Sequence, residues 1–227
     1  MDAPTGRPRY DGLADWYDAE VRRLPLTGTA ADALLRLLGP GPGRCLDLAC
    51  GTGLTLAPLA ALGWRVTGLD LSGDQLRLAR DRAAACGAAL VRADAAVLPF
   101  PDGSFDAAVS LFARTDLDDP AGAAAETARV LRPGGWLVDV GTHPCFVHPF
   151  AERAADGSIL LHPGYRSRGR HRAGPGFGTG IRPRVGVNHL PLADLLGVYL
   201  DAGFTLRRVG EPGDDAYPFL LAFVLER

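Results

Sequence analysis

Short apolar runs alternate with segments of helical period along residues 44–141. Each run is too short for a helix and is bounded by glycine, proline or polar residues, which is typical of buried strands. Helices are predicted between the runs, where apolar residues recur every three or four positions, as they do after Ser72 and Pro120. The predicted strands are residues 44–50, 64–69, 89–92, 104–111 and 136–141. This alternation predicts an α/β fold whose parallel sheet is covered by helices.

The two ends of the chain follow other patterns. Residues 1–40 are predicted to be helical and to precede the sheet, whereas residues 143–190 hold many glycines and prolines and show no sustained period. Irregular segments above ~15 residues often form lids or binding loops in compact domains. We therefore predict a single domain, 1–227, with an N-terminal helical cap and an insertion at 143–190. The remaining predicted elements are a short strand at 158–161, a helix at 192–202 and strands at 205–209 and 217–226.

Composition narrows the class of protein. Hydrophobic residues make up 47% and charged residues 22%, which is typical of a globular chain. No apolar run reaches the ~18 residues that a membrane-spanning helix needs, and no apolar segment follows basic residues at the start. The four cysteines have neither C-x-x-C spacing nor the density of a disulfide framework. We expect a cytoplasmic protein without a membrane partner, either a monomer or a homodimer.

The charged residues exclude several kinds of chemistry. The formal net charge of −2 gives no general attraction to nucleic acid, so we expect no nucleic-acid partner. All 24 basic residues are arginine. Without lysine, the chain can form neither a lysine Schiff base nor a Walker-type phosphate loop.

The clearest motif follows the first predicted strand. Gly51 and Gly53 come directly after it, where glycine lets the backbone approach a ligand and the next helix offers free N–H groups. Asp70 follows Gly53 by 17 positions and ends the second strand, which suits a carboxylate that binds ribose hydroxyls. Leu56 stands where a dinucleotide-binding loop has its third glycine. The motif predicts a nucleoside-containing ligand without a pyrophosphate.

These residues resemble the class I S-adenosylmethionine-dependent methyltransferases. Tyr10 with residues 14–18 is similar to the N-terminal Y-D-x-x-A-x-x-Y-D element of the small-molecule, ubiquinone- and menaquinone-type members. The resemblance implies a Rossmann-like fold, with a mostly parallel seven-stranded sheet, helices on both faces and an inserted lid. The matching segments are Leu46–Gly53, Val66–Ser72, Ala93–Phe100, Phe105–Ser110 and Val130–Gly135.

The resemblance also implies roles for individual residues. S-adenosylmethionine would be the cofactor and S-adenosylhomocysteine the product. Asp70 would bind the ribose hydroxyls, Leu71 would pack on the adenine and Asp94 would accept a hydrogen bond from its amino group. The cofactor-binding residues implied by the family are Tyr10, Tyr17, Asp47, Gly51, Gly53, Asp70, Leu71, Asp94, Ala95, Ser110 and Leu111.

The acceptor site is less clearly marked. All five histidines fall between positions 143 and 189. His143 directly follows the fifth predicted strand, and we expect either His143 or His189 to remove a proton from a hydroxyl or amine acceptor. Histidines in glycine- and proline-rich loops can equally be solvated or packed. Asp116 is a third catalytic candidate, as base or orienter, although an acid before Pro120 can simply begin a helix.

The insertion is also rich in arginine. Six arginines between 166 and 184 can bind an anionic acceptor by paired hydrogen bonds, or can simply form a solvated basic loop. No metal site is predicted, since the histidines lack an i, i+4 helical pair and the cysteines are scattered. Because the insertion follows a strand end beside the cofactor, we expect it to become ordered when ligands bind.

We therefore expect methyl transfer to an oxygen, nitrogen or carbon atom of a small molecule, in bacterial metabolism or natural-product synthesis. The segment Ser110–Ala113 lacks the N/D-P-P-Y pattern of methyltransferases acting on bases or glutamine, and Arg114–Asp119 lacks the H-H-L pattern of quinone-type relatives. Two alternatives are a cofactor-binding regulatory protein without catalysis and a nicotinamide dehydrogenase. The latter is disfavoured by Leu56 and by the absence of the lysine of a Tyr-Lys hydride relay.

Overall fold

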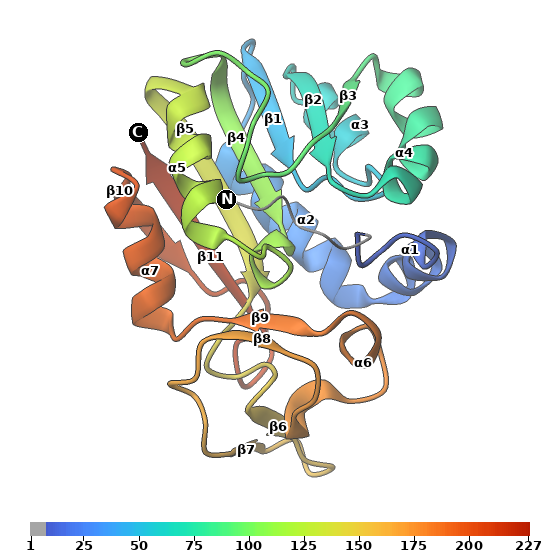
Figure 1. The fold of residues 1–227 in the computed structure, drawn as a ribbon, viewed down its shortest axis with the longest axis vertical. Helices are drawn as coiled ribbons and strands as arrows, with labels where there is room; N and C mark the ends of the chain where they lie inside the picture. The colour runs from blue at the N-terminus through green and yellow to red at the C-terminus, as the bar shows by residue number, and fades with distance from the viewer. Residues whose placement is uncertain (1–7) are drawn as a thin grey trace.

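The computed structural model describes residues 8–227, and its centre is a seven-stranded sheet (Figure 1). The strand order is β10-β11-β5-β4-β1-β2-β3, and only β11 runs against the others. This topology confirms the predicted mostly parallel sheet. The strands are β1 (Arg44–Leu48), β2 (Arg65–Asp70), β3 (Ala89–Arg92), β4 (Phe105–Leu111), β5 (Leu131–Thr142), β10 (Thr205–Gly210) and β11 (Leu220–Glu226).

Helices cover both faces of the sheet because successive strand residues point to opposite sides. On one face, Cys45 and Val109 pack under α2 (Pro25–Leu38), α3 (Leu56–Ala61) and α4 (Gly73–Cys86). On the other, Leu46 and Phe223 pack under α5 (Pro120–Val130) and α7 (Leu192–Asp201). The sheet thus separates two apolar cores.

Strand β5 begins earlier than its apolar pattern predicts. The apolar pattern predicts a strand from residue 136, but β5 starts at Leu131. The register against β4 shifts at this point, and Gly134 adopts a positive φ of 74°. Gly134 and Gly135 pair with the backbone of Arg227 after β11. Pairing with the distant Arg227 thus extends the strand beyond its apolar run.

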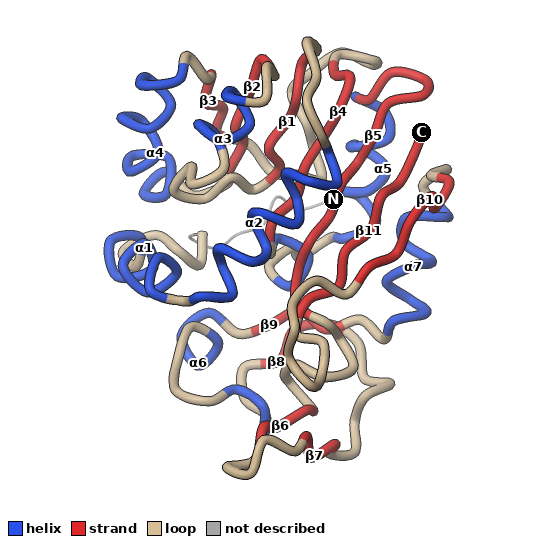
Figure 2. The backbone as a smooth tube through the Cα atoms, turned by 180° about the vertical axis from the view of Figure 1, so that it is seen from behind, coloured by secondary structure: helices blue, strands red, loops and turns tan. Residues whose placement is uncertain are grey.

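The insertion contains more regular structure than its sequence indicates. Strand β6 (Ala151–Arg153) pairs with β7 (Ile159–Leu161), which confirms the short strand predicted there. The prediction of no further regular structure was wrong, because β8 (Gly169–His171) pairs with β9 (Val187–His189). A 3-10 turn η2 (Pro175–Phe177) and α6 (Arg182–Val185) lie between β8 and β9. Figures 1 and 2 show the insertion beyond the carboxyl ends of β1, β4 and β5.

The predicted N-terminal cap is helical over α1 (Ala14–Arg23) and α2, whereas residues 1–7 of that prediction lie outside the described residues. Asp18 of α1 accepts a hydrogen bond from the Thr52 hydroxyl at 2.6 Å and pairs with Arg82 of α4 at 2.9 Å. These contacts hold the cap beside the glycine turn after β1. Across residues 8–227, no helix is both long and apolar enough to cross a membrane.

Candidate functional site

A cavity of about 320 Å³ lies at the carboxyl ends of β1, β2 and β4. Ligands of open α/β sheets bind at this edge, because the loops after parallel strands meet there. The N-terminal segment and the insertion also contribute to its walls. The lining residues are Pro8, Arg9, Tyr10, Ala49, Leu69, Asp70, Leu71, Ser72, Ala93, Asp94, Ala95, Ala113, Asp116, Leu117, Asp118, Asp119 and Arg172.

Asp70 lies at the floor of this cavity as the last residue of β2. One carboxylate oxygen accepts from the backbone N–H of Gly51 at 2.9 Å, and the other from that of Ser72 at 2.8 Å. Burial nevertheless raises the pKa of Asp70 above its usual value. Each carboxylate oxygen can accept a further hydrogen bond, so Asp70 can bind two neighbouring hydroxyl groups.

The cavity edge beyond Asp70 is suited to a flat base. Leu71 is 41% exposed, which is unusual for a leucine at the end of a buried strand, and its side chain lines the cavity. Asp94 and Ala95 line it from the loop after β3. One Asp94 oxygen accepts from the backbone N–H of Ala96 at 2.9 Å and holds the carboxylate in place. These are the positions that the sequence predicts for adenine.

Two non-glycine residues have the left-handed backbone at this edge, a feature that sequence reasoning missed. Ala49 after β1 has φ 55° and Phe112 after β4 has φ 60°. Such conformations cost free energy for residues with a Cβ atom and are concentrated at functional sites. An alanine or a phenylalanine in the sequence gives no indication of a left-handed backbone. Among the predicted glycines, Gly51 and Gly53 also have positive φ, and a Cβ atom on Gly53 would lie 2.8 Å from Leu56 of α3.

The residues predicted around the methionine end do not line the cavity. Asp47 is buried in β1 below the glycine turn, where it accepts a hydrogen bond from the Thr55 hydroxyl. Burial raises the pKa of Asp47 to about 7, and the negative charge of Asp70 adds to this. Six of the predicted cofactor-binding residues lie outside the walls of this cavity: Asp47, Gly51, Gly53, Tyr17, Ser110 and Leu111.

The two N-terminal tyrosines meet the loop that follows β4. The rings of Tyr10 and Tyr17 pack edge to face with centroids 4.8 Å apart. Burial raises the pKa of both hydroxyls, and the carboxylate of Asp116 raises them further. Tyr10 and Asp116 both line the cavity. The structure thus brings these two predicted residues together with Asp70, Leu71, Asp94 and Ala95.

Arginines from two distant segments fasten this loop. Arg182 of α6 donates through Nη1 to both oxygens of Asp116, at 3.1 and 3.2 Å. Arg9 and Arg170 both pair with Asp118, at 2.6 and 3.0 Å. The insertion and the N-terminal segment are therefore both bound to the loop that lines the cavity.

Half of the predicted arginine cluster pairs with carboxylates of the protein, namely Arg168, Arg170 and Arg182. Arg168 pairs with Asp194 at 2.7 Å, and Arg184 lies over the Trp16 ring at 4.1 Å. Of the six arginines, Arg172 lines the main cavity. Three of the six arginines are thus bound by carboxylates that are distant in the sequence.

The two catalytic histidine candidates lie outside the main cavity. His143 is 3% exposed; its Nδ1 accepts from the backbone N–H of Cys145, and its Nε2 lies 3.1 Å from Glu211. Burial lowers the pKa of His143. Both nitrogens are engaged, so the structure does not place His143 to take a proton from an acceptor. His189 bonds the Tyr165 carbonyl through Nε2 at 2.8 Å and lines a smaller pocket nearby.

No group of three or more His, Cys, Asp or Glu side chains within residues 8–227 is arranged to hold a metal ion. The cavity walls instead offer carboxylate oxygens, the side chain of Tyr10 and apolar side chains. These groups suit a nucleoside with a polar tail.

Comparison with known proteins agrees with this geometry. A family model described as "Methyltransferase domain" matches residues 46–139. Over the whole fold, the chain resembles the crystal structure of an S-adenosylmethionine-dependent methyltransferase from Mesorhizobium loti. The TM-score is 0.71 and the sequence identity 27%, and the alignment covers 96% of this chain and 99% of the other. Residues 46–139 thus match a methyltransferase domain, and the fold around them is that of the class I S-adenosylmethionine-dependent methyltransferases.

Curated members of the family with similar sequences are demethylmenaquinone methyltransferases. The chain is 36% identical over 141 residues to the enzyme of Renibacterium salmoninarum, covering 60% of this chain and 59% of that protein. It is 39% identical over 149 residues to the enzyme of Tropheryma whipplei, and this match covers 63% of this chain and 62% of that protein. The chain thus spans about three fifths of the length of these relatives. The predicted family, fold and cofactor are confirmed.

Proposed function

We propose that this methyltransferase transfers the methyl group of S-adenosylmethionine to an oxygen, nitrogen or carbon atom of a small molecule, and releases S-adenosylhomocysteine. One observation carries the proposal: Asp70, which suits ribose, and the Tyr10–Asp116 contact lie on the walls of one cavity. The demethylmenaquinone relatives support a small-molecule acceptor.

The residues present fit the cofactor. Asp70 would bind the ribose hydroxyls, Leu71 and Ala95 would pack on the adenine, and Asp94 would accept from its amino group. Gly51 and Gly53 do not line the cavity themselves, but their turn has positive φ angles and its Gly51 N–H holds the Asp70 carboxylate in place. Once bound, the cofactor supplies a methyl group on a sulfonium sulfur, a leaving group that needs no acid.

On the acceptor side, the protein orients the nucleophile and excludes water. Among the three catalytic candidates, Asp116 is the one that lines the cavity. Because Arg182 holds both of its oxygens, we propose that Asp116 orients the acceptor and the tyrosines rather than acting as a strong base. An acceptor with an anionic group would meet Arg172, since Arg168, Arg170 and Arg182 already bind carboxylates of the protein.

Two measurements test the proposal. Calorimetry should detect binding of S-adenosylmethionine to the purified protein. Incubation with the methyl-labelled cofactor and a low-molecular-weight extract should yield a labelled small molecule, and the Asp70→Ala variant should yield much less. Binding without any label transfer would favour the alternative, a cofactor-binding regulatory protein.

We also propose that the protein acts in a reducing compartment such as the cytoplasm. All four cysteines are free thiols, and Cys45 and Cys50 are buried. Burial raises the pKa of both thiols, which keeps them protonated and unreactive. Alkylation of the native protein should therefore modify Cys86 and Cys145 well before the buried pair.

A further inference from the structure

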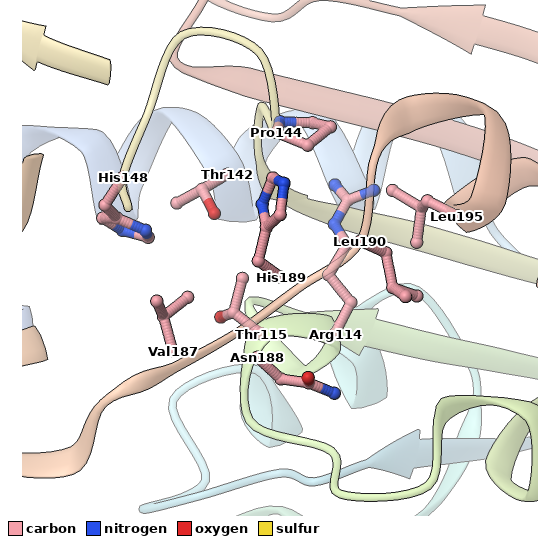
Figure 3. Close-up of a pocket in the computed structure, with 10 residues that line it drawn as sticks. All are labelled: Arg114, Thr115, Thr142, Pro144, His148, Val187, Asn188, His189, Leu190 and Leu195. Atoms are coloured by element: carbon pink, nitrogen blue, oxygen red, sulfur yellow. The ribbon is translucent and has the colours of Figure 1, made fainter. Parts of the chain in front are cut away.

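Arg114 lies behind the wall of the cofactor cavity rather than in it. The loop after β4 contributes Ala113 and residues 116–119 to that wall. The Arg114 side chain, which lies between them in the sequence, is only 4% exposed and lines a smaller pocket on the side of the insertion. Figure 3 shows its guanidinium group between His189 and Leu195. A charged group is therefore buried directly behind this part of the wall.

The guanidinium group reaches two neighbouring strands, β5 and β11. Its Nη1 lies 3.2 Å from a carboxylate oxygen of Asp139 on β5, and its Nη2 donates to the carbonyl of Leu221 on β11. The guanidinium carbon also lies 5.3 Å from the centroid of the Phe223 ring on β11. The same Asp139 oxygen accepts from the Tyr199 hydroxyl of α7 at 2.9 Å. One side chain thus fastens the loop after β4 to two strands and, through Asp139, to a helix.

Strand β5 leaves room for this side chain at Gly141. A Cβ atom at that position would lie 2.5 Å from Nε of Arg114, so the guanidinium group would have to move. Glycine inside a strand weakens it and often marks a place where another group approaches closely. Asp139 and Gly141 lie two positions apart, so they share one face of the sheet. This face of β5 is therefore shaped to receive the arginine.

The chain turns where the loop leaves the sheet. The N–H of Phe112 donates to the carbonyl of Val140 at 2.8 Å, so the pairing of β4 with β5 extends to this residue. Phe112 then adopts the left-handed φ of 60°. Such a conformation costs free energy for a residue with a Cβ atom and persists only where the surrounding structure holds it. Arg114, anchored two positions later, supplies such a hold.

The buried pair is weak evidence for a role in stability. Nε of Arg114 and Oδ1 of Asp139 have no hydrogen-bond partner among residues 8–227, and burial of the two charges costs hydration free energy. Replacement of a buried ion pair by uncharged groups of similar size is often neutral for stability or even stabilising. The effect of the pair is therefore mainly geometric, because it fixes where residues 113–119 lie relative to the sheet.

We propose that Arg114 is a positioning residue: paired with Asp139, it holds the wall formed by Ala113 and residues 116–119 in the arrangement that binds the cofactor. This inference rests on the proposed function, because that wall belongs to the proposed cofactor site. Arg114 itself contacts neither the cofactor nor the acceptor. Loss of the pair should therefore weaken cofactor binding although no group is removed from the cavity wall.

A matched pair of glycine variants tests this inference. Gly141→Ala places a methyl group against Nε of Arg114 and should weaken binding of S-adenosylmethionine about tenfold in calorimetry, within the range of substitutions that do not touch the ligand. The control is Gly197→Ala in α7, where a Cβ atom meets nothing within 4 Å and affinity should not change. Hydrogen exchange should become faster at residues 112–119 in Gly141→Ala and stay unchanged in the body of β4.

A second variant removes the charges themselves. Arg114→Met combined with Asp139→Asn leaves no buried charge unpaired, so the melting temperature should change little while affinity again falls about tenfold. Arg114→Lys keeps a cation for Asp139 and should retain more of the affinity than the double variant. The control for stability is Leu225→Val, because Leu225 is fully buried at the opposite end of β11 and its truncation should lower the melting temperature without changing affinity.

These measurements separate positioning from stability. Wild-type affinity in either the folded Gly141→Ala protein or the folded double variant would overturn the inference. An equal loss of affinity in Leu225→Val would also overturn it, since the effect would then follow stability alone. If the wild type does not bind S-adenosylmethionine, the proposed function fails, whereas normal binding by the wild type and by the variants removes only the role of Arg114.

Discussion

Nη1 of Arg182 lies 3.1 and 3.2 Å from the two carboxylate oxygens of Asp116, and this pair joins the insertion to the loop after β4. The two side chains are 11% and 20% exposed. A pair held this far from water loses more when one partner is removed than a surface pair does, because the remaining charge stays buried and unpaired. The contact therefore couples the position of the insertion to the wall of the cofactor cavity.

Removal of this guanidinium should destabilise the protein. We expect Arg182→Ala to lower the free energy of unfolding by about 2–4 kcal/mol in urea denaturation. The matched control is Arg168→Ala, which breaks a pair whose arginine is 68% exposed and should cost less than about 1 kcal/mol. Equal losses in the two variants would mean that the Arg182–Asp116 pair does not hold the insertion.

The cofactor assignment gives a prediction for Asp70. Asp70→Ala should weaken binding of S-adenosylmethionine by about 1.5–3 kcal/mol, since two hydroxyls lose a charged acceptor. Calorimetry measures this, and Asp81→Ala on the exposed side of α4 serves as the control. Unchanged affinity in a folded Asp70→Ala protein would remove this carboxylate from the site.

Asp47 gives a prediction about pH. Its pKa of about 7 in the folded protein lies above the ~3.9 of an unfolded aspartate, so the unfolded chain ionises first as the pH rises. The contribution of Asp47 to stability is therefore full below pH ~4 and is lost between pH ~4 and ~7.

Asp47→Asn should flatten this dependence and, at pH 8, raise the free energy of unfolding by at most ~4 kcal/mol, because the amide can still accept from Thr55 without ionising. Urea denaturation of both proteins at pH 4.5 and pH 8 measures the difference. A stability gap that is the same at both pH values would show that Asp47 is ionised throughout.

His143 is expected to serve stability rather than proton transfer. Its two nitrogens bond Cys145 and Glu211, so His143→Asn should keep methyl transfer within about threefold while lowering the melting temperature. A general base would instead lose 10²-fold or more in kcat. A loss of that size, with cofactor affinity intact, would restore His143 as the base.

The insertion remains predicted to gain order when ligands bind. The β8–β9 pair is tied to the loop after β4 through Arg170 and Asn188, whereas β6 and β7 pair mainly with each other. Hydrogen exchange with S-adenosylhomocysteine should therefore show increased protection at residues 169–171 and 187–189 and little change at 151–161. Identical exchange in the free and bound protein would make the insertion a fixed surface element.

The sequence by itself determined the strands and helices around the cavity and several residues that line it. Each of these signals is local: an apolar run of five to seven residues makes a strand, Gly51 and Gly53 follow β1 directly, and Asp70 ends β2. A local pattern constrains the backbone wherever the segment lies in the fold, and the spacing of the motifs places their strand ends at one edge of the sheet.

Only the tertiary structure decided which side chains meet across long stretches of chain. Arg182 binds Asp116 across 66 positions, and His143 meets Glu211 across 68. Sequence reasoning favoured His143 because it follows β5, yet its ring turns to Glu211. It also left the arginine cluster open to an anionic ligand, although Asp116, Asp118 and Asp194 take three of its members. A guanidinium can pair with any carboxylate that the fold brings within reach, and the path of the chain, which no local pattern encodes, selects the partner.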